Sequence, residues 1–172
     1  MAVRNIIYTL LSISLVLNIW LILQNKKEKE RADIATLFLT IIAVENKLDS
    51  YASYIGNPGL FEWAWNDPAL PKILSNKTID IIAGITETIN IAESDQVTIP
   101  TDVKGNLIMM RDIVENKYFP ATLEPTTKEN QKKIIDFYRS IKFYFDVGGP
   151  SNSWSKFEER IDNFLKSESN KY

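Results

Sequence analysis

In the segment IATLFLTIIAVENKLDSYASYI, residues 34–55, the apolar residues recur at alternating intervals of three and four, and this pattern predicts the helix around which the rest of the chain is organised. Spacing of this kind places apolar side chains along one side of a helix. No Gly or Pro interrupts the stretch before Gly56-Asn57-Pro58-Gly59, where the helix is predicted to end. The members of the apolar series are Ile34, Leu37, Ile41, Val44, Leu48, Tyr51 and Ile55.

Neighbouring positions set the width of this apolar face. Phe38 and Ile42 lie beside the series and widen it beyond the seam of a two-stranded zipper, which favours a helix packed inside a bundle. The polar and charged residues fall outside the stripe. They are Asp33, Glu45, Asn46, Lys47, Asp49 and Ser50.

Later segments repeat the helical spacing of apolar residues and are separated by stretches that contain Gly or Pro. The predicted helices cover residues 72–93, 102–118 and 127–146, and Ser153 or Ser155 begins a last one. Short connections between helices favour antiparallel neighbours. The predicted fold class is therefore all-α, with an N-terminal transmembrane helix followed by an antiparallel helical bundle of four to five helices.

Two of these helices carry unusual residues. Gly84 lies off the centre of its apolar stripe, at a point where a neighbouring helix could approach closely. The helix over residues 127–146 is rich in aromatic residues that cover more than one face, which predicts burial on two sides. These aromatic residues are Phe137, Tyr138, Phe143, Tyr144 and Phe145.

Residues 6–23, IIYTLLSISLVLNIWLIL, form an uncharged run near the amino terminus. At ~1.5 Å per residue a helix of this length reaches ~27 Å, close to the thickness of the hydrocarbon core of a bilayer. Tyr8 and Trp20 stand near its two ends, where aromatic rings prefer the level of the lipid headgroups. We therefore expect this segment to interact with the lipid bilayer as a single span.

A cleaved signal peptide is the alternative, because Arg4 forms a small basic region ahead of the run. Residues 20–25 lack the small residues of a cleavage site, which favours an uncleaved anchor. Ser14 and Asn18 lie four residues apart and either bond to their own backbone or join a helix–helix contact in the membrane. The lack of a small-xxx-small motif favours the first interpretation.

Charge is unevenly distributed along the chain. Residues 1–31 hold five Lys or Arg and two acidic residues, which leaves 15 basic and 20 acidic residues in 32–172, a net charge of −5. An acidic domain without a basic cluster does not favour nucleic acid, so no nucleic-acid partner is predicted. The predicted organisation is a membrane anchor with a charged flank over residues 1–31, a helical bundle domain over 32–168 and a frayed tail over 169–172.

The chain contains neither Cys nor His, and this excludes much chemistry. Ser-His-Asp and Cys-His nucleophile systems and Cys/His zinc sites cannot be assembled without these residues. Glu158 and Asp162 share a helix face, which is the ordinary place for solvated charges. A weaker metal hypothesis gathers four carboxylates near one bundle end, without the spacing of a calcium loop. These four are Glu87, Glu93, Asp95 and Asp102. We predict no catalytic residue, no metal site and no cofactor, and hence no enzyme.

An aromatic loop follows the first bundle helix and contains the candidate binding residues Phe61, Trp63 and Trp65. Pro58 before it and Pro68 after it make a long helix here improbable. The loop is predicted either to plug the far end of the bundle or to form a patch for a protein partner or apolar ligand. The plug is favoured, because buried aromatic rings are the commoner case.

These features predict a single-pass membrane protein whose helical domain binds a partner or senses a ligand without catalysis. The alternative is a structural accessory subunit of a membrane complex. Cues to orientation conflict, because the larger number of Lys and Arg after the span argues for a cytoplasmic domain. A short basic tail followed by one anchor and a domain is typical of exported bacterial proteins, and we predict an extracytoplasmic domain at the cell membrane on this ground.

Overall fold

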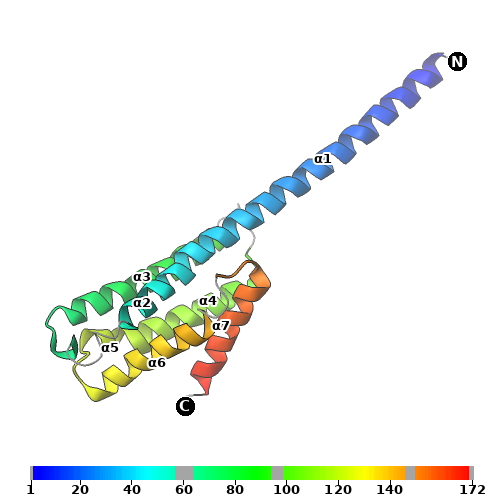
Figure 1. Ribbon diagram of the computed structural model, residues 1–172. Helices are drawn as coiled ribbons and strands as arrows, with labels where there is room; N and C mark the ends of the chain where they lie inside the picture. Colours follow the sequence, from blue (N-terminus) through cyan, green and yellow to red (C-terminus); the bar gives the residue numbers. More distant parts are fainter. Residues whose placement is uncertain (1, 57–63, 94–98, 146–149, 171–172) are drawn as a thin grey trace. The chain divides into compact units, whose positions relative to one another are not determined.

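The structure, a computed structural model, describes residues 2–56, 64–93, 99–145 and 150–170, with the side chains of 2–10, 12 and 64 left aside. All regular structure within these ranges is helical (Figure 1). The chain divides into two compact units, Met1–Ala35 and Thr36–Tyr172. The prediction of an all-α helical bundle is confirmed for the second unit.

The first unit consists of most of helix α1, Ala2–Thr40. Its side chains at residue 11 and from 13 to 30 are exposed. No helix formed by the described residues is long and apolar enough to cross a membrane. The predicted span covers residues 6–23, and the structure does not describe the side chains of residues 6–10 and 12 within it.

The predicted apolar seam is buried from Val44 to Ile55. The π-helical turn η1, Ile41–Glu45, follows α1 directly and leads into α2, Asn46–Ile55. Val44, Leu48 and Tyr51 are fully buried, as the apolar series predicts. Helical structure thus continues through the stretch to Ile55 without a break.

Upstream of η1 the predicted register is wrong. A π turn inserts one extra residue, so the positions before it rotate by about 100° relative to an unbroken α-helix. Thr36 and Thr40 are buried at the upstream positions, whereas Ile34 is 68% exposed. Phe38 and Ile42, which were expected to widen the buried stripe, are also largely exposed.

Helix α3, Leu70–Glu93, packs antiparallel to η1 and α2. Lys77 reaches Ser50 near one end of the contact, with 3.0 Å between Nζ and the hydroxyl oxygen. Near the other end Gly84 lies so close to Ala43 that a Cβ on Gly84 would be 1.7 Å from the Ala43 carbonyl oxygen. The predicted close approach of a neighbouring helix at Gly84 is confirmed.

The threonines of α3 bond to their own helix, which lets a β-branched polar sequence stay buried. The Thr78 hydroxyl donates to the Leu74 carbonyl at 2.9 Å, and the Thr88 hydroxyl donates to the Gly84 carbonyl at 2.9 Å. Both side chains are buried. These hydrogen bonds to the helix's own backbone offset the cost of burying the two hydroxyls, so a neighbouring helix need not supply a hydrogen-bond partner.

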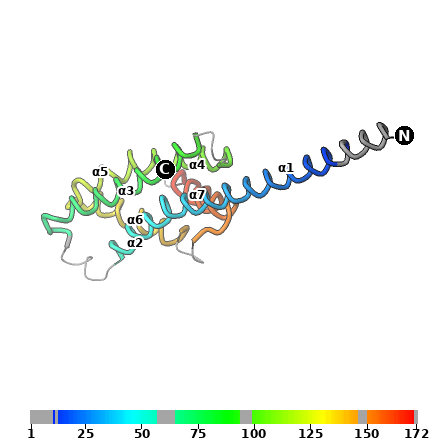
Figure 2. Tube along the Cα trace, turned by 90° about the horizontal axis from the view of Figure 1, so that it is seen from above, coloured from blue at the N-terminus to red at the C-terminus, as the bar shows by residue number. Residues whose placement is uncertain are grey.

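The remaining helices complete the bundle. They are α4, Thr101–Ile113; the π-helical turn η4, Val114–Tyr118; α5, Phe119–Leu123; α6, Lys128–Tyr144; and α7, Trp154–Ser169. Ser153 caps α7 by accepting a hydrogen bond from the Lys156 backbone N–H, which confirms one of the two predicted caps. Helix α7 packs against both α4 and α6, and Figure 2 shows it between them.

One aromatic ring joins four elements at the centre of this unit. The ring of Phe137 from α6 stacks on Tyr118 of η4 at a centroid distance of 4.3 Å. It also contacts Tyr51 of α2 at 5.1 Å and Phe164 of α7 at 6.3 Å. The prediction of burial on two sides holds for Phe137 but is wrong for Phe143, which is 69% exposed. Phe143 follows the buried Ile141 by two residues and therefore lies on the opposite side of α6, which faces solvent.

Replacing Gly84 by Ala should lower the free energy of unfolding by about 3 kcal/mol, because the new methyl group collides with backbone rather than with a movable side chain. Gly105→Ala is the matched control, since a Cβ at Gly105 meets nothing within 4 Å. The control should be neutral or stabilise by up to about 1 kcal/mol through helix propensity. Urea unfolding of both variants measures the difference. Equal stability of the two variants would contradict the close contact.

Tyr51→Phe should stabilise the chain by about 1 kcal/mol at neutral pH, because the buried Tyr51 hydroxyl has no hydrogen-bond partner among the described residues. Burial also raises the pKa of Tyr51 above its ordinary value of 10.0. The unfolded chain therefore loses this proton first, and stability falls as pH rises above about 10. Urea unfolding at pH 7 and about pH 11 should show a shallower alkaline loss in the variant. A variant less stable than the parent at pH 7 would show that the hydroxyl is bonded.

Candidate functional site

A buried carboxylate closes the first π turn. Glu45 is the last residue of η1, and its side chain is 5% exposed. One oxygen accepts a hydrogen bond from the Ser151 backbone N–H at 2.8 Å. The other accepts from the Ser151 hydroxyl at 2.5 Å and from Nη1 of Arg160 at 2.9 Å. Glu45 therefore ties η1 to Ser151, just before α7, and to Arg160 in the middle of α7.

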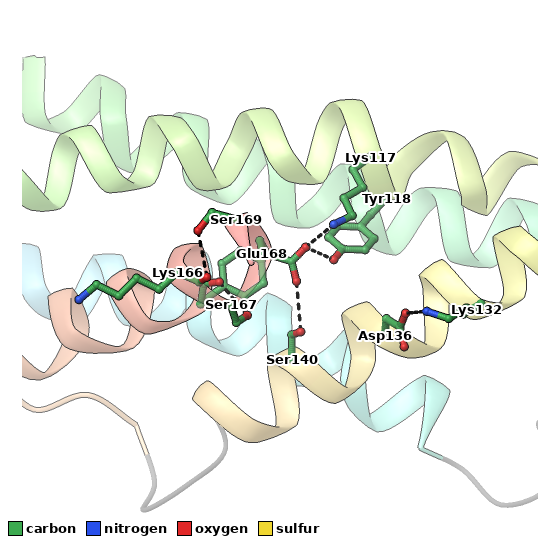
Figure 3. Close-up of polar contacts among 10 residues, drawn as sticks. Lys117, Tyr118, Lys132, Asp136, Ser140, Lys166, Ser167, Glu168 and Ser169 are labelled. Atoms are coloured by element: carbon green, nitrogen blue, oxygen red, sulfur yellow. Dashed lines mark hydrogen bonds and ion pairs between the residues drawn. The ribbon is translucent and has the colours of Figure 1, made fainter. Parts of the chain in front are cut away.

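A second buried carboxylate, Glu168, lies near the end of α7 (Figure 3). One oxygen accepts hydrogen bonds from Nζ of Lys117, at 2.7 Å, and from the Tyr118 hydroxyl. The other oxygen accepts from the Ser140 hydroxyl at 3.3 Å. Glu168 therefore joins α7 to both η4 and α6.

Each carboxylate cluster uses residues of a π turn. Glu45 ends η1, whereas Lys117 and Tyr118 end η4. The extra residue of a π turn redirects the following side chains, which brings polar groups to positions that an unbroken α-helix would give to apolar ones. In both clusters the other partner of the ion pair lies on α7, as Arg160 or Glu168.

The geometry of both clusters is that of cross-links. Both oxygens of each carboxylate accept hydrogen bonds from the protein itself. A general acid or base must instead exchange a proton with a substrate within hydrogen-bond reach. Buried ion pairs of this kind hold elements in one arrangement as long as both partners are present.

A groove of about 740 Å³ runs between α7 and the α4–η4 segment. Its apolar part is formed by Met109, Ile113 and Leu165, and the Lys117–Glu168 pair forms part of its lining. An adjoining hollow of about 770 Å³ extends it toward the start of both helices. The two volumes share Asn106, Met109 and Asp162, so they form one groove. This groove is the most promising binding surface of the described residues.

The predicted aromatic site lies only partly within the description. Phe61 and Trp63 are outside the described residues. Trp65 belongs to the short 3₁₀ helix η3, Ala64–Asn66, and is partly buried against the core. Its packing is what a plug requires, and the prediction of a partner patch there stays untested.

The described members of the predicted acidic groups do not come together as a metal site. Among the residues that the structure describes, no group of three carboxylates is arranged to hold an ion. Glu93 pairs with Lys104 at 2.9 Å. Asp162 pairs with Lys166 at 2.5 Å on the surface of α7, and Asp95 lies outside the described residues.

Comparisons with known families, with curated proteins and with solved structures find no match to this chain.

The sequence contains a signal for the second cluster. The apolar series of the last helix runs through Trp154, Phe157, Ile161 and Phe164, and the next step of four falls on Glu168. A charged residue at an apolar position predicts a buried partner of opposite charge. The placement of Glu45 outside the apolar stripe is wrong, because Glu45 is buried and lies three residues before the buried Leu48, on the same helix face.

Glu168→Gln should lower the free energy of unfolding by about 3 kcal/mol, because it leaves the ammonium of Lys117 largely buried without its counter-charge. Asp162→Asn is the matched control on the same helix, since Asp162 belongs to a solvent-exposed pair with Lys166. The control should change stability by no more than about 0.5 kcal/mol. Chemical unfolding of both variants measures their free energies of unfolding relative to the parent chain. An equally small loss for the two variants would refute a structural role for Glu168.

Proposed function

We propose that this chain is a membrane-anchored helical module that binds a protein partner without catalysis. The proposed membrane anchor is supported by the run of exposed apolar side chains on α1. Within residues 11–23 every large apolar side chain described is about half exposed or more. These residues are Leu11, Ile13, Leu15, Val16, Leu17, Ile19, Trp20, Leu21, Ile22 and Leu23.

The exposed side chains point in all directions around the helix. Consecutive residues from Trp20 to Leu23 step by about 100° each and so cover every side. An amphipathic helix would leave one polar side for water, but a helix that is apolar all round needs an apolar environment on every side. Burying each such side chain gains about 1.5–3 kcal/mol, which favours lipid over water. The uncharged length of residues 6–23 supports a single span.

The absence of catalysis is proposed from residue types and from the carboxylate clusters. The sequence has no Cys or His. The two acidic side chains that are buried among the described residues, Glu45 and Glu168, accept hydrogen bonds from protein donors. Partner binding is proposed from the groove beside α7. We place the domain outside the cytoplasm, on the layout of a short basic tail, one span and one domain.

Lys substitutions at Leu15 and Ile19 should abolish membrane association, because each charge at the middle of a span costs about 2.5–3.5 kcal/mol. Gln24→Lys with Asn25→Lys is the matched control, since both residues are exposed on the same helix outside the uncharged run. Flotation of cell membranes after alkaline extraction is the measurement. The parent chain and the control should float, whereas the Leu15/Ile19 variant should stay at the bottom of the gradient.

A parent chain that does not float would refute the anchor. The same preparation tests the orientation with Ser169→Cys, which introduces the only thiol at an exposed position. An impermeant maleimide should label this thiol in intact cells. Labelling only after lysis would place the domain in the cytoplasm.

A further inference from the structure

We infer that the groove between α4 and α7 binds a cationic amphipathic helix of a partner protein. The inference rests on the proposed partner-binding function and adds the surface and the chemistry of the partner. Three features of the groove support this inference: an apolar floor, an acidic end whose charges form no ion pair among the described residues, and a length that fits a helix.

The apolar floor exposes one large side chain, Met109, beside Ile113, which is partly buried, and Leu165, which is buried. Met109 is 50% exposed and lies in both parts of the groove. Ile113 and Leu165 continue the apolar lining toward η4. Methionine is a flexible and polarisable side chain that adapts to the apolar face of a bound helix. Exposed apolar surface rimmed by polar residues is typical of interaction sites.

The charges of the groove decide which partner fits. Lys117 and Lys166 are the basic residues in its lining, and they pair with Glu168 and Asp162, respectively. Both basic side chains therefore already carry a counter-charge. Their position is toward the ends of η4 and α7.

The opposite end of the groove is acidic. It is lined by Asp102, Glu158 and Glu159, none of which forms an ion pair with any residue that the structure describes. No Lys or Arg of the part of the chain that the structure describes lines this part of the groove. Complementary charge therefore requires Lys or Arg on the partner at this end.

The length of the groove fits a helix of about four turns. Its lining extends along α4 and η4 from Thr101 to Lys117 and along α7 from Ser155 to Ser169. At ~1.5 Å per residue these segments are ~20–25 Å long, which corresponds to a bound helix of about 16 residues. An amphipathic helix of this length would place its apolar side on Met109 and Leu165 and its basic residues near Glu158 and Glu159.

The walls of the groove are held in place before a partner arrives. Leu107 and Met110 of α4 and Phe157 and Ile161 of α7 are fully buried beneath it. Glu168 fixes the far end of α7 to η4 through Lys117. A preformed groove lowers the entropy cost of ordering on binding.

The test uses the full chain in nanodiscs of neutral phosphatidylcholine and a synthetic peptide of about 16 residues. The peptide carries Leu on one helical face and Lys elsewhere, and a second peptide with Glu in place of Lys is the charge control. Because the chain has no Cys, Ser155→Cys places a single environment-sensitive dye at the rim of the groove. Ser53→Cys, exposed on α2 and outside the groove lining, carries the dye in the control chain.

The Lys peptide should give a saturable emission change with the dye at position 155 and none at position 53. Glu158→Lys with Glu159→Lys should raise the Kd about tenfold or more, because both rim charges then repel the peptide. The matched control, Asp80→Lys with Glu87→Lys, reverses two exposed charges on α3 outside the groove and should change the Kd less than about twofold.

Several outcomes would overturn the inference. They are no response at position 155 up to about 200 μM peptide, equal responses at both dye positions, equal binding of the Glu peptide, and equal weakening by the α3 control. Flotation measures membrane association, whereas the emission of the dye measures peptide binding. Failure of the anchor and failure of the groove are therefore distinguishable.

Discussion

The carboxylate of Glu45 is removed from water at the end of a π turn, and the bundle must supply it with a counter-charge. Taking an ion out of water costs several kcal/mol, which only a well-placed partner can offset. Arg160, 115 residues further along the chain, provides the counter-charge. Ser151, 106 residues further along, donates hydrogen bonds to the same carboxylate. The contact couples the η1 turn to the last helix, and we expect that removing either partner leaves the other charge buried without compensation.

The position of α7 follows from this coupling and from the second cluster. Arg160 holds the middle of α7 to η1, while Glu168 holds its end to η4. Between these two bonds the ring of Phe164 packs on Phe137, the aromatic side chain that also contacts α2 and η4. A helix fixed at two points beside α4 leaves a groove of constant shape. The surface proposed to bind a partner thus depends on the buried contacts of Arg160 and Phe164 and on the Lys117–Glu168 pair, which lines the groove itself.

Much of the fold could be predicted from apolar spacing, because spacing reports which side of a helix is buried. Leu48 and Gly84 show this at the level of single positions, one as a fully buried member of the seam and the other as a close contact. The register of Ile34 could not be predicted, because a π turn has no local sequence signal comparable to Gly or Pro. Its extra residue is stabilised by tertiary bonds of Glu45 that are remote in sequence. The groove was also beyond prediction, since it requires knowing that α4 and α7 are neighbours.

The energetic coupling between Glu45 and Arg160 can be measured by a double-mutant cycle. The cycle compares the free energies of unfolding of Glu45→Gln, Arg160→Met and the double variant with that of the parent chain. We predict that each single change costs about 3 kcal/mol and that the double variant is at least about 1.5 kcal/mol more stable than the sum of the two losses implies. Additive losses would contradict the account, because they would show that these two side chains contribute independently.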